Sequence, residues 1–207
     1  MPDFNKKYLF RMTHIYNIEH ILTHGITHRN SPNANNKYKS IGDNTLISTR
    51  NIHPLDNGKS IGDYIPFYFG VRTPMLYVII KGFNGVSPTP SESIVYCVTS
   101  IQQILDSDID FIFTDGHAVD SFSSKYSKEQ IIDIDNILDY SAINATHWKD
   151  ENDLDKKRRK EAEFLLECDL PSKYILGYIC YNEKAKVSLI SLGISENKIV
   201  IKPDFYF

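Results

Sequence analysis

The sequence has 207 residues and a formal net charge of −3, and these bulk properties exclude several classes of protein. Hydrophobic residues make up 42% and charged residues 24%, which is ordinary for a globular protein and excludes a disordered or fibrous chain. The longest apolar run, Met75 to Ile80, is too short to span a bilayer, and the N-terminus shows no signal peptide. We therefore expect one domain over residues 1–207, located in the cytoplasm and without membrane contact.

The cysteines and histidines give no metal site. The three cysteines lie far apart in the sequence, with neither a disulfide framework nor metal-ligand spacing, which fits a reducing compartment. His20, His24 and His28 recur every four residues, and on a helix the first two would share a face as a metal-binding pair does. Gly25 is expected to end that helix before His28, and no acidic cluster adjoins it. We therefore interpret these histidines as solvated surface groups and predict no bound metal.

The first half of the chain is predicted to hold short strands and helices around one long polar loop. Asn17 is suited to cap an early helix and Gly25 to end it. Residues 29–45 are rich in Asn and longer than most connections, which is typical of a functional or mobile loop. The expected strands cover residues 8–12 and 46–50, and the expected helices cover residues 18–23 and 73–80.

The segment Asp63 to Phe69 is dense in aromatic residues and β-formers, and it contains a proline. Pro66 has no backbone N–H to donate to a neighbouring strand. This favours an edge position, a bend or a segment lining a site over a central strand.

The second half of the chain mixes predicted strands and helices without regular alternation. The pattern therefore favours the α+β class over a parallel sheet built from βαβ units. The expected strands cover residues 93–99, 110–114, 174–181 and 198–202, and the expected helices cover residues 101–105, 128–145 and 183–191.

Two charged stretches near residue 160 each allow two interpretations. The basic run 156–160 is a candidate contact for a phosphate backbone, or else a solvated segment neutralised by the acids at 150–155. If the segment after it is a strand, Glu161 and Glu163 face one side and could line a polar site. If it is a helix, the two carboxylates lie on different faces of that helix, in solvent. Periodicity alone does not decide between the strand and the helix.

A set of segments, taken in order along the chain, forms a recognisable series: Tyr8–Gly25, Ile41–Asp43 followed by Arg50, Tyr64–Phe69 with Arg72–Tyr77, Phe113–His117 and Glu161–Leu165. The most specific are the aromatic PFYF…PMLY block and the later AEFL element. Together, in this order, they resemble the DarT family of toxins that ADP-ribosylate DNA.

The resemblance implies an α+β fold of the ADP-ribosyltransferase type, with two small packed β-sheets around an NAD cleft and flanking helices. It implies that the loop 29–45 covers the cofactor and that residues 146–162 present the substrate. The implied site residues are Glu163 and Arg50 as catalytic groups; His14, Thr13, Asn17, Gly25, Tyr68 and Tyr77 as cofactor contacts; and Met75, Lys157, Arg158 and Arg159 as substrate contacts.

The implied reaction moves ADP-ribose from NAD onto a thymidine or guanosine base in single-stranded DNA and releases nicotinamide, with no metal. A carboxylate suits this chemistry, because breaking the nicotinamide–ribose bond builds positive charge on the sugar. The implied partner is an antitoxin, a macrodomain-type hydrolase that removes ADP-ribose. Two alternatives stay open: a transferase of the same fold acting on protein or RNA, and a binding module without catalysis.

Overall fold

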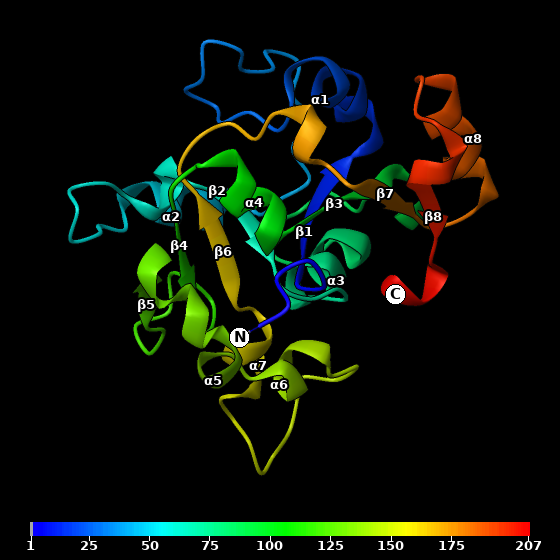
Figure 1. Ribbon diagram of the computed structural model, residues 1–207. Coiled ribbons are helices and arrows are strands. Elements are labelled where there is room, and N and C mark those ends of the chain that lie inside the picture. The colour runs from blue at the N-terminus through cyan, green and yellow to red at the C-terminus, as the bar shows by residue number, and fades with distance from the viewer. Residues whose placement is uncertain (1) are drawn as a thin grey trace.

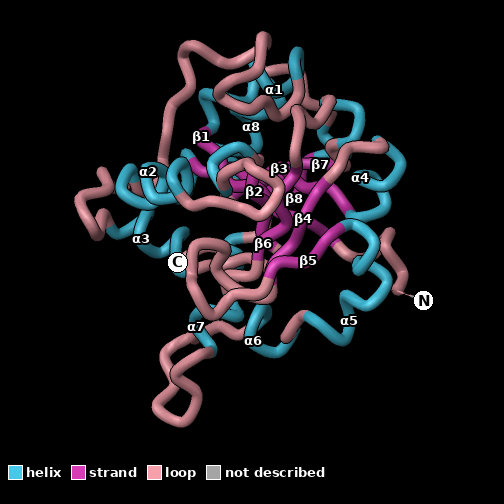
Figure 2. The backbone as a smooth tube through the Cα atoms, turned by 90° about the vertical axis from the view of Figure 1, so that its left-hand side faces the viewer, coloured by secondary structure: helices cyan, strands magenta, loops and turns pink. Residues whose placement is uncertain are grey.

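The computed structural model describes residues 2–207, with helices around one eight-stranded sheet (Figures 1 and 2). The strands are β1 (Tyr8–His14), β2 (Ile65–Tyr68), β3 (Ile94–Ser100), β4 (Phe111–Thr114), β5 (Lys125–Ser127), β6 (Glu163–Leu166), β7 (Gly177–Cys180) and β8 (Ile199–Ile201). The α-helices are α1 (Ile18–His24), α2 (Asn44–Ile52), α3 (Pro74–Lys81), α4 (Ile101–Ser107), α5 (Ile134–Ile137), α6 (Tyr140–Asn144), α7 (Lys156–Lys160) and α8 (Glu183–Ser191). None of the helices within residues 2–207 has the length and hydropathy needed to cross a membrane.

The sheet has a narrow junction at its centre. The strand order is β5-β4-β6-β2-β1-β3-β7-β8, and every neighbouring pair is antiparallel except β7 and β8. At the centre, β1 and β2 are paired only at Phe10 and Tyr68. The two small sheets implied by the resemblance are therefore two halves of one continuous sheet, joined at this point. Beyond it the halves separate, and the separation leaves room for a cavity.

Pro66 lies in a central strand, so the expected edge position is wrong, although the alternative of a site-lining segment is correct. On the β1 side, β2 pairs only through Tyr68, so the missing N–H of Pro66 removes no ladder hydrogen bond. The Pro66 carbonyl instead accepts a hydrogen bond from the Arg11 guanidinium, at 2.9 Å. The proline therefore sits where the two halves of the sheet separate.

Two predicted elements differ in the structure. Residues 46–50, expected as a strand, belong to helix α2, because the Asp43 side chain caps the helix by accepting from the N–H groups of Thr45 and Leu46. The single helix expected over 128–145 is a 3₁₀ segment followed by α5 and α6. Its apolar positions are spaced for a helix, but Asp139 caps a new helix at its end and so divides the segment.

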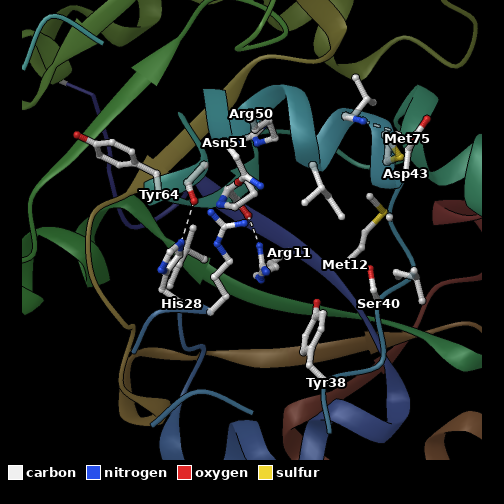
Figure 3. Close-up of a pocket in the computed structure, with 18 of the residues that line it drawn as sticks. Arg11, Met12, His28, Tyr38, Ser40, Asp43, Arg50, Asn51, Tyr64 and Met75 are labelled. Atoms are coloured by element: carbon white, nitrogen blue, oxygen red, sulfur yellow. Dashed lines mark hydrogen bonds between the residues drawn. The ribbon is translucent and has the colours of Figure 1, made fainter. Parts of the chain in front are cut away.

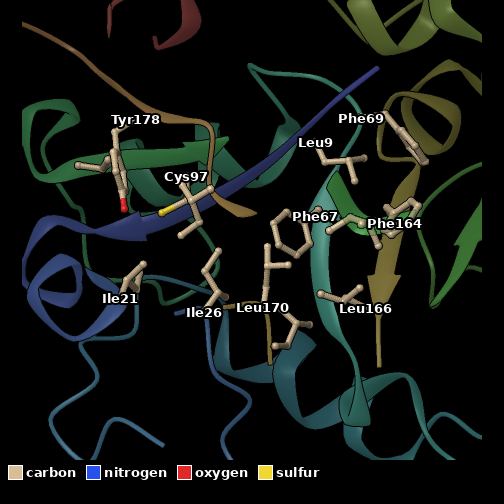
Figure 4. Close-up of a cluster of buried hydrophobic side chains, with 14 of the residues drawn as sticks. Leu9, Ile21, Ile26, Phe67, Phe69, Cys97, Phe164, Leu166, Leu170 and Tyr178 are labelled. Carbon is tan, nitrogen blue, oxygen red and sulfur yellow. The ribbon is translucent and has the colours of Figure 1, made fainter. Parts of the chain in front are cut away.

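The main hydrophobic core lies against the sheet and is shared by strands from both of its halves. Figure 4 shows Leu9 of β1 close to Phe67 of β2 and Phe164 of β6. Phe164 also contacts Phe111 on β4, with ring centroids 4.3 Å apart. These rings are buried, so this part of the aromatic content of the chain is structural. The packing fixes the position of β6, which carries the first residue of the candidate site.

Gly25 ends α1 with a backbone conformation that favours glycine, at φ 81°. A Cβ atom at this position would lie 2.1 Å from the carbonyl oxygen of Leu170, with which the neighbouring Ile26 forms an isolated β-bridge. We expect Gly25→Ala to lower the free energy of unfolding by about 2 kcal/mol or more, because backbone strain and a clash with backbone atoms add together. Urea denaturation of the variant and the wild type measures this change.

Gly58 offers a matched control for this prediction. Its φ is 79°, but a Cβ atom there would have nothing within 4 Å. Gly58→Ala should therefore show the conformational penalty alone, about 1 kcal/mol. Equal losses of stability in the two variants would contradict the clash with Leu170.

Candidate active site

Glu163 is the first residue of β6 and is fully buried. The structure therefore decides in favour of the strand alternative for the segment that follows the basic run. One carboxylate oxygen, Oε2, accepts a hydrogen bond from Arg50 Nη1 at 2.7 Å, and the other, Oε1, accepts one from the backbone N–H of Ala118 at 3.0 Å. An ionised carboxylate buried this deeply needs such partners. The site thus holds a carboxylate in one fixed orientation.

Arg50 lies on α2 and joins Glu163 to a large cavity. Its side chain lines the cavity while its Nη1 atom holds Glu163. The other terminal nitrogen, Nη2, is buried and has no hydrogen-bond partner among residues 2–207. Buried guanidinium donors are normally satisfied, so an unused one at a cavity wall is suited to a polar ligand.

The cavity has a volume of about 440 Å³, within the size range of small-molecule and cofactor sites. It opens where the two halves of the sheet separate, so both halves contribute to its wall. Figure 3 shows Arg11 from β1 between the α2 residues Arg50 and Asn51 on one side and Tyr38 on the other. Tyr68 and Met75, two of the predicted site residues, also line it. Glu163 does not line the cavity, so a ligand there meets Arg50 first.

The loop 29–45 forms much of one side of this cavity, as expected of a segment that covers a ligand. Its attachment point is Asn17, which is buried. The Asn17 amide donates to the carbonyl of Lys39 at 2.9 Å and accepts from the Lys39 N–H at 2.8 Å. It also donates to the hydroxyl of Thr13 at 2.9 Å. Thr13 and Asn17 therefore hold the loop from below and line only a small hollow beside the main cavity.

For the NAD that the resemblance implies, we expect Asn17→Ala to raise KM about tenfold with a smaller effect on kcat, since the loop loses both of its bonds through Lys39. Steady-state kinetics with NAD as the varied substrate measures this. Asn182→Ala is the matched control, because it removes the cap of α8, far along the chain from the loop. A KM unchanged in Asn17→Ala, or equally raised in both variants, would contradict the role of Asn17.

His14, expected to contact the cofactor, is buried at the end of β1 and does not line the cavity. Its Nδ1 accepts the N–H of Tyr16 at 3.1 Å, and the two rings lie 4.5 Å apart. Burial, with a smaller contribution from the positive charge of Lys39, lowers the pKa of His14. The imidazole is therefore neutral at pH 7.

Gly25 and Tyr77, also expected at the cofactor, lie outside the cavity lining. Gly25 closes α1 against Leu170, as described above. The ring of Tyr77 packs against Trp148 and Phe207, with centroids 5.8 Å and 5.1 Å away. These two contacts connect α3 to the segment before α7, through Trp148, and to the last residue, Phe207.

The basic run forms α7, and the acids before it are its partners. Arg158 pairs with Asp155 and Asp115, and Arg159 pairs with Asp139, Asp153 and Asp155. Lys157 differs, because its side chain is 60% exposed and its one partner, Glu161, is 3.4 Å away.

The last residue of the run, Lys160, is buried and donates to the carbonyl of Ile143 at 2.9 Å. Burial lowers its pKa to about 8. Of the three basic residues predicted to contact the substrate, Lys157 is therefore the one most available to a phosphate, whereas Arg158 and Arg159 are held by several carboxylates.

Sequence reasoning did not assign a role to several residues of the site. Arg11 and His117 line the cavity, and Ala118 binds Glu163. The resembling segment Phe113–His117 was the available signal for His117, and Ala118 follows it directly. His28 is also part of the wall, and its Nε2 donates to the carbonyl of Gly62 at 2.8 Å. The interpretation of His28 as a solvated surface group is therefore wrong, because its ring is half-buried at the cavity wall and is held there by Gly62.

Residues 2–207 contain no group of three or more histidine, cysteine or acidic side chains placed to bind a metal ion. His20 and His24 do lie side by side on α1, with ring centroids 4.7 Å apart and ring planes tilted by 34°. However, His20 Nε2 is engaged by the carbonyl of Asn33 at 2.9 Å. This bond is a second attachment of the loop 29–45.

Comparison with known proteins connects this geometry to a family. Residues 10–207 match the family model described as "ssDNA thymidine ADP-ribosyltransferase, DarT". A DNA ADP-ribosyl transferase from Escherichia coli O127:H6 is 32% identical over 187 residues, covering 89% of this chain and 84% of that protein. A DNA ADP-ribosyl transferase–DNA ADP-ribosyl glycohydrolase fusion protein from Thermosipho africanus is 28% identical, and the match covers 96% of this chain and 49% of the fusion.

Solved structures of DarT from Thermus sp. 2.9 share the fold over the whole chain. The complex with ADP-ribosylated single-stranded DNA superposes with a TM-score of 0.83 at 28% identity, covering 100% of this chain and 98% of the Thermus chain. The complex of the same protein with NAD⁺ gives a TM-score of 0.79 at 27% identity.

Proposed function

This chain belongs to the DarT family of single-stranded-DNA thymidine ADP-ribosyltransferases, and we propose that Glu163 and Arg50 form its catalytic centre. Its reaction moves the ADP-ribosyl group of NAD onto a thymine base of single-stranded DNA and releases nicotinamide. The observation that carries the proposal is the pair itself. A buried carboxylate is held by a guanidinium that lines a cofactor-sized cavity and keeps one donor unused.

Glu163 is suited to stabilise the sugar as its glycosidic bond breaks. The bond between the ribose C1′ and the nicotinamide nitrogen breaks, and its electron pair leaves with nicotinamide. Positive charge develops on the ribose, and the fixed negative charge of Glu163 stabilises it without reorganisation. The hydrogen bonds from Arg50 and Ala118 hold the carboxylate in place before the reaction begins.

The acceptor must lose a proton during the transfer. Thymine in DNA carries one ring N–H, and this nitrogen forms the new bond to C1′ while its proton moves to a base. Glu163 is the proposed base, since it is a carboxylate whose partner Arg50 lines the cavity. Single-stranded DNA suits this chemistry because that ring nitrogen is occupied by base pairing in a duplex.

Arg50 is proposed to bind the reactants through Nη2 while Nη1 holds Glu163. A planar guanidinium can serve both tasks with separate N–H groups. The free donor is suited to the diphosphate of NAD or to a carbonyl oxygen of the accepting base. A lysine could not make both contacts from one fixed position.

Of the residues proposed to contact NAD, one lines the cavity, and the others lie behind its wall or hold the loop that covers it. Tyr68 lines the cavity and is the direct neighbour of Glu163 across β2 and β6. Thr13 and Asn17 act through the loop that they hold, and His14 adjoins it as a neutral imidazole. Gly25 and Tyr77 support the cavity through backbone and aromatic packing.

For the DNA, we propose Met75 at the cavity wall and Lys157 on α7 as direct contacts. Arg158 and Arg159 are proposed to shape the segment that presents the substrate, residues 146–162, through their ion pairs. Most of the positive charge on α7 is already balanced by carboxylates. The salt dependence of DNA binding should therefore be shallow.

We further propose that residues 1–207 act as one catalytic unit and as a toxin in the cytoplasm, where NAD and single-stranded DNA occur together. The proposed partner is an antitoxin that removes ADP-ribose from DNA, a macrodomain-type hydrolase. Support comes from the Thermosipho africanus fusion protein, whose name joins a DNA ADP-ribosyl transferase to a DNA ADP-ribosyl glycohydrolase.

The proposal is tested by incubating the protein with NAD and three sets of acceptors. These are oligonucleotides with thymidine as the varied base, oligonucleotides with guanosine in its place, and cell protein and RNA. We expect label from NAD on the thymidine oligonucleotides, with nicotinamide released in equal amount. Label found only on the guanosine oligonucleotides would contradict thymidine as the accepting base. Label found only on protein or RNA would contradict DNA as the substrate. Nicotinamide release no higher than without enzyme would favour a binding module.

A further inference from the structure

A row of neighbouring residues crosses four strands of the sheet at the candidate site. Tyr68 of β2 pairs with Glu163 of β6, and Thr114 of β4 pairs with Lys125 of β5. The ladder between β4 and β6 ends one position earlier, at Phe113 and Phe164, and its register continued by one residue places Thr114 beside Glu163. The Thr114 hydroxyl also lies 3.1 Å from the N–H of Glu163. Side chains of directly opposed residues project from the same face of an antiparallel sheet. Lys125 therefore projects from the same face as Glu163, two strands away, at a distance of about 10 Å.

Lys125 lies on an exposed edge strand and has no ion-pair partner within residues 2–207. It lies close enough to His53 to affect its charge, because burial, followed by the positive charges of Lys125 and Arg50, lowers the pKa of His53. His53 directly follows α2, the helix that carries Arg50. Two positive groups, Arg50 and Lys125, thus lie on either side of His53, and the one at the sheet edge, Lys125, is the one that no carboxylate of residues 2–207 pairs with.

An exposed aromatic residue lies on the connection that leads to this strand. Phe122 is 82% exposed, in the turn formed where the N–H of Ser123 bonds to the carbonyl of Asp120. The same connection contains Ala118, whose N–H binds Glu163, and Ser123, whose hydroxyl lies 3.3 Å from the Arg158 guanidinium. The turn is therefore attached to the site at two points.

We propose that Lys125 and Phe122 bind the nucleotide next to the target thymidine. The Lys125 ammonium holds the phosphate that joins the two nucleotides, and Phe122 stacks on the neighbouring base. Single-stranded nucleic acid is bound in this way elsewhere, through a positive track for the backbone and aromatic faces for the bases. The subsite lies on the β5 side of Glu163, opposite the cavity side that takes NAD. It rests on the proposed function, because it has a role only if the acceptor is a nucleic-acid strand.

The test compares single variants on a thymidine oligonucleotide long enough to fill both subsites, at saturating NAD. We expect Lys125→Ala to lower kcat/KM for the oligonucleotide about fivefold and to reduce the slope of log KM against log salt by about 0.7, the value for one contact to a single strand. Phe122→Ala should lower kcat/KM about tenfold, and Phe122→Tyr should restore most of it. Nicotinamide release in the absence of DNA should be unchanged in all three variants.

Lys202→Ala is the matched control, because it removes one exposed lysine next to β8, at the other edge of the sheet. A salt slope and kcat/KM equal in Lys125→Ala and Lys202→Ala would overturn the phosphate contact while leaving the transfer reaction intact. A Phe122→Ala variant with wild-type kcat/KM would overturn the stacking contact. No transfer to any oligonucleotide by the wild type would overturn both this inference and the proposed function.

Discussion

Glu163→Gln is expected to lower transfer of ADP-ribose to DNA about a thousandfold, some 4 kcal/mol of transition-state stabilisation. Glutamine keeps the size of the side chain, and its single carbonyl oxygen can still accept a hydrogen bond from one of the two donors, Arg50 or Ala118, which bind different oxygens of the glutamate. It removes the negative charge that opposes the charge developing on the ribose, and it cannot take the proton of the base. Initial rates on a thymidine oligonucleotide at saturating NAD measure the loss.

Glu167→Gln is the control for this variant. Glu167 directly follows β6, but its carboxylate is partly exposed and pairs with Lys59 at the surface. We expect a rate within twofold of the wild type from Glu167→Gln. The catalytic assignment is wrong if Glu163→Gln keeps more than a tenth of the wild-type rate and remains folded.

Arg50→Ala is expected to abolish transfer and also to destabilise the fold by about 3–5 kcal/mol. Arg50 supplies the charged partner of Glu163, whose carboxylate would otherwise remain buried with only the N–H of Ala118. Removing one partner of a buried ion pair leaves an uncompensated charge. Urea denaturation and the oligonucleotide assay together measure both effects.

The double variant Arg50→Ala/Glu163→Gln separates the two effects. A neutral side chain at 163 no longer requires the guanidinium, so stability should recover by about 2 kcal/mol or more relative to Arg50→Ala. Activity should not recover, since both catalytic groups are absent. A double variant as unstable as Arg50→Ala would show that the ion pair is not the source of the loss.

The parts of the fold that depend on local signals could be predicted from the sequence. Thr73, Pro74 and Gly82 mark the limits of α3 in the positions where a cap, a first-turn proline and a left-handed end residue are favoured. The predictions that failed depend on distant contacts. Residues 46–50 have a strand-like composition, yet the cap at Asp43 and the ion pair to Glu163 hold them in a helix. Pro66 occupies a central strand because β1 pairs with only one residue of β2.

The candidate site shows the same division. Glu163 and Arg50 were proposed from resemblance, and the structure places them 2.7 Å apart although 113 residues separate them in the sequence. Periodicity could not choose between strand and helix for Glu163, because the apolar run after it is too short. Periodicity also could not identify two of the acidic partners of Arg158 and Arg159, because Asp115 and Asp139 come from distant segments of the chain. The acids at 150–155 pair with α7, which is the neutralising role that the sequence offered as one of its two interpretations.

The central claim is that this protein joins ADP-ribose to a thymine base of single-stranded DNA through Glu163. Tandem mass spectrometry of an oligonucleotide with one thymidine, treated with NAD and either wild-type protein or Glu163→Gln, tests it most directly. We predict one ADP-ribosyl group in the wild-type reaction, retained on the thymine base after the backbone is fragmented, and none with Glu163→Gln. ADP-ribose found on a terminal phosphate or another base, or present in equal amount with Glu163→Gln, would contradict the claim.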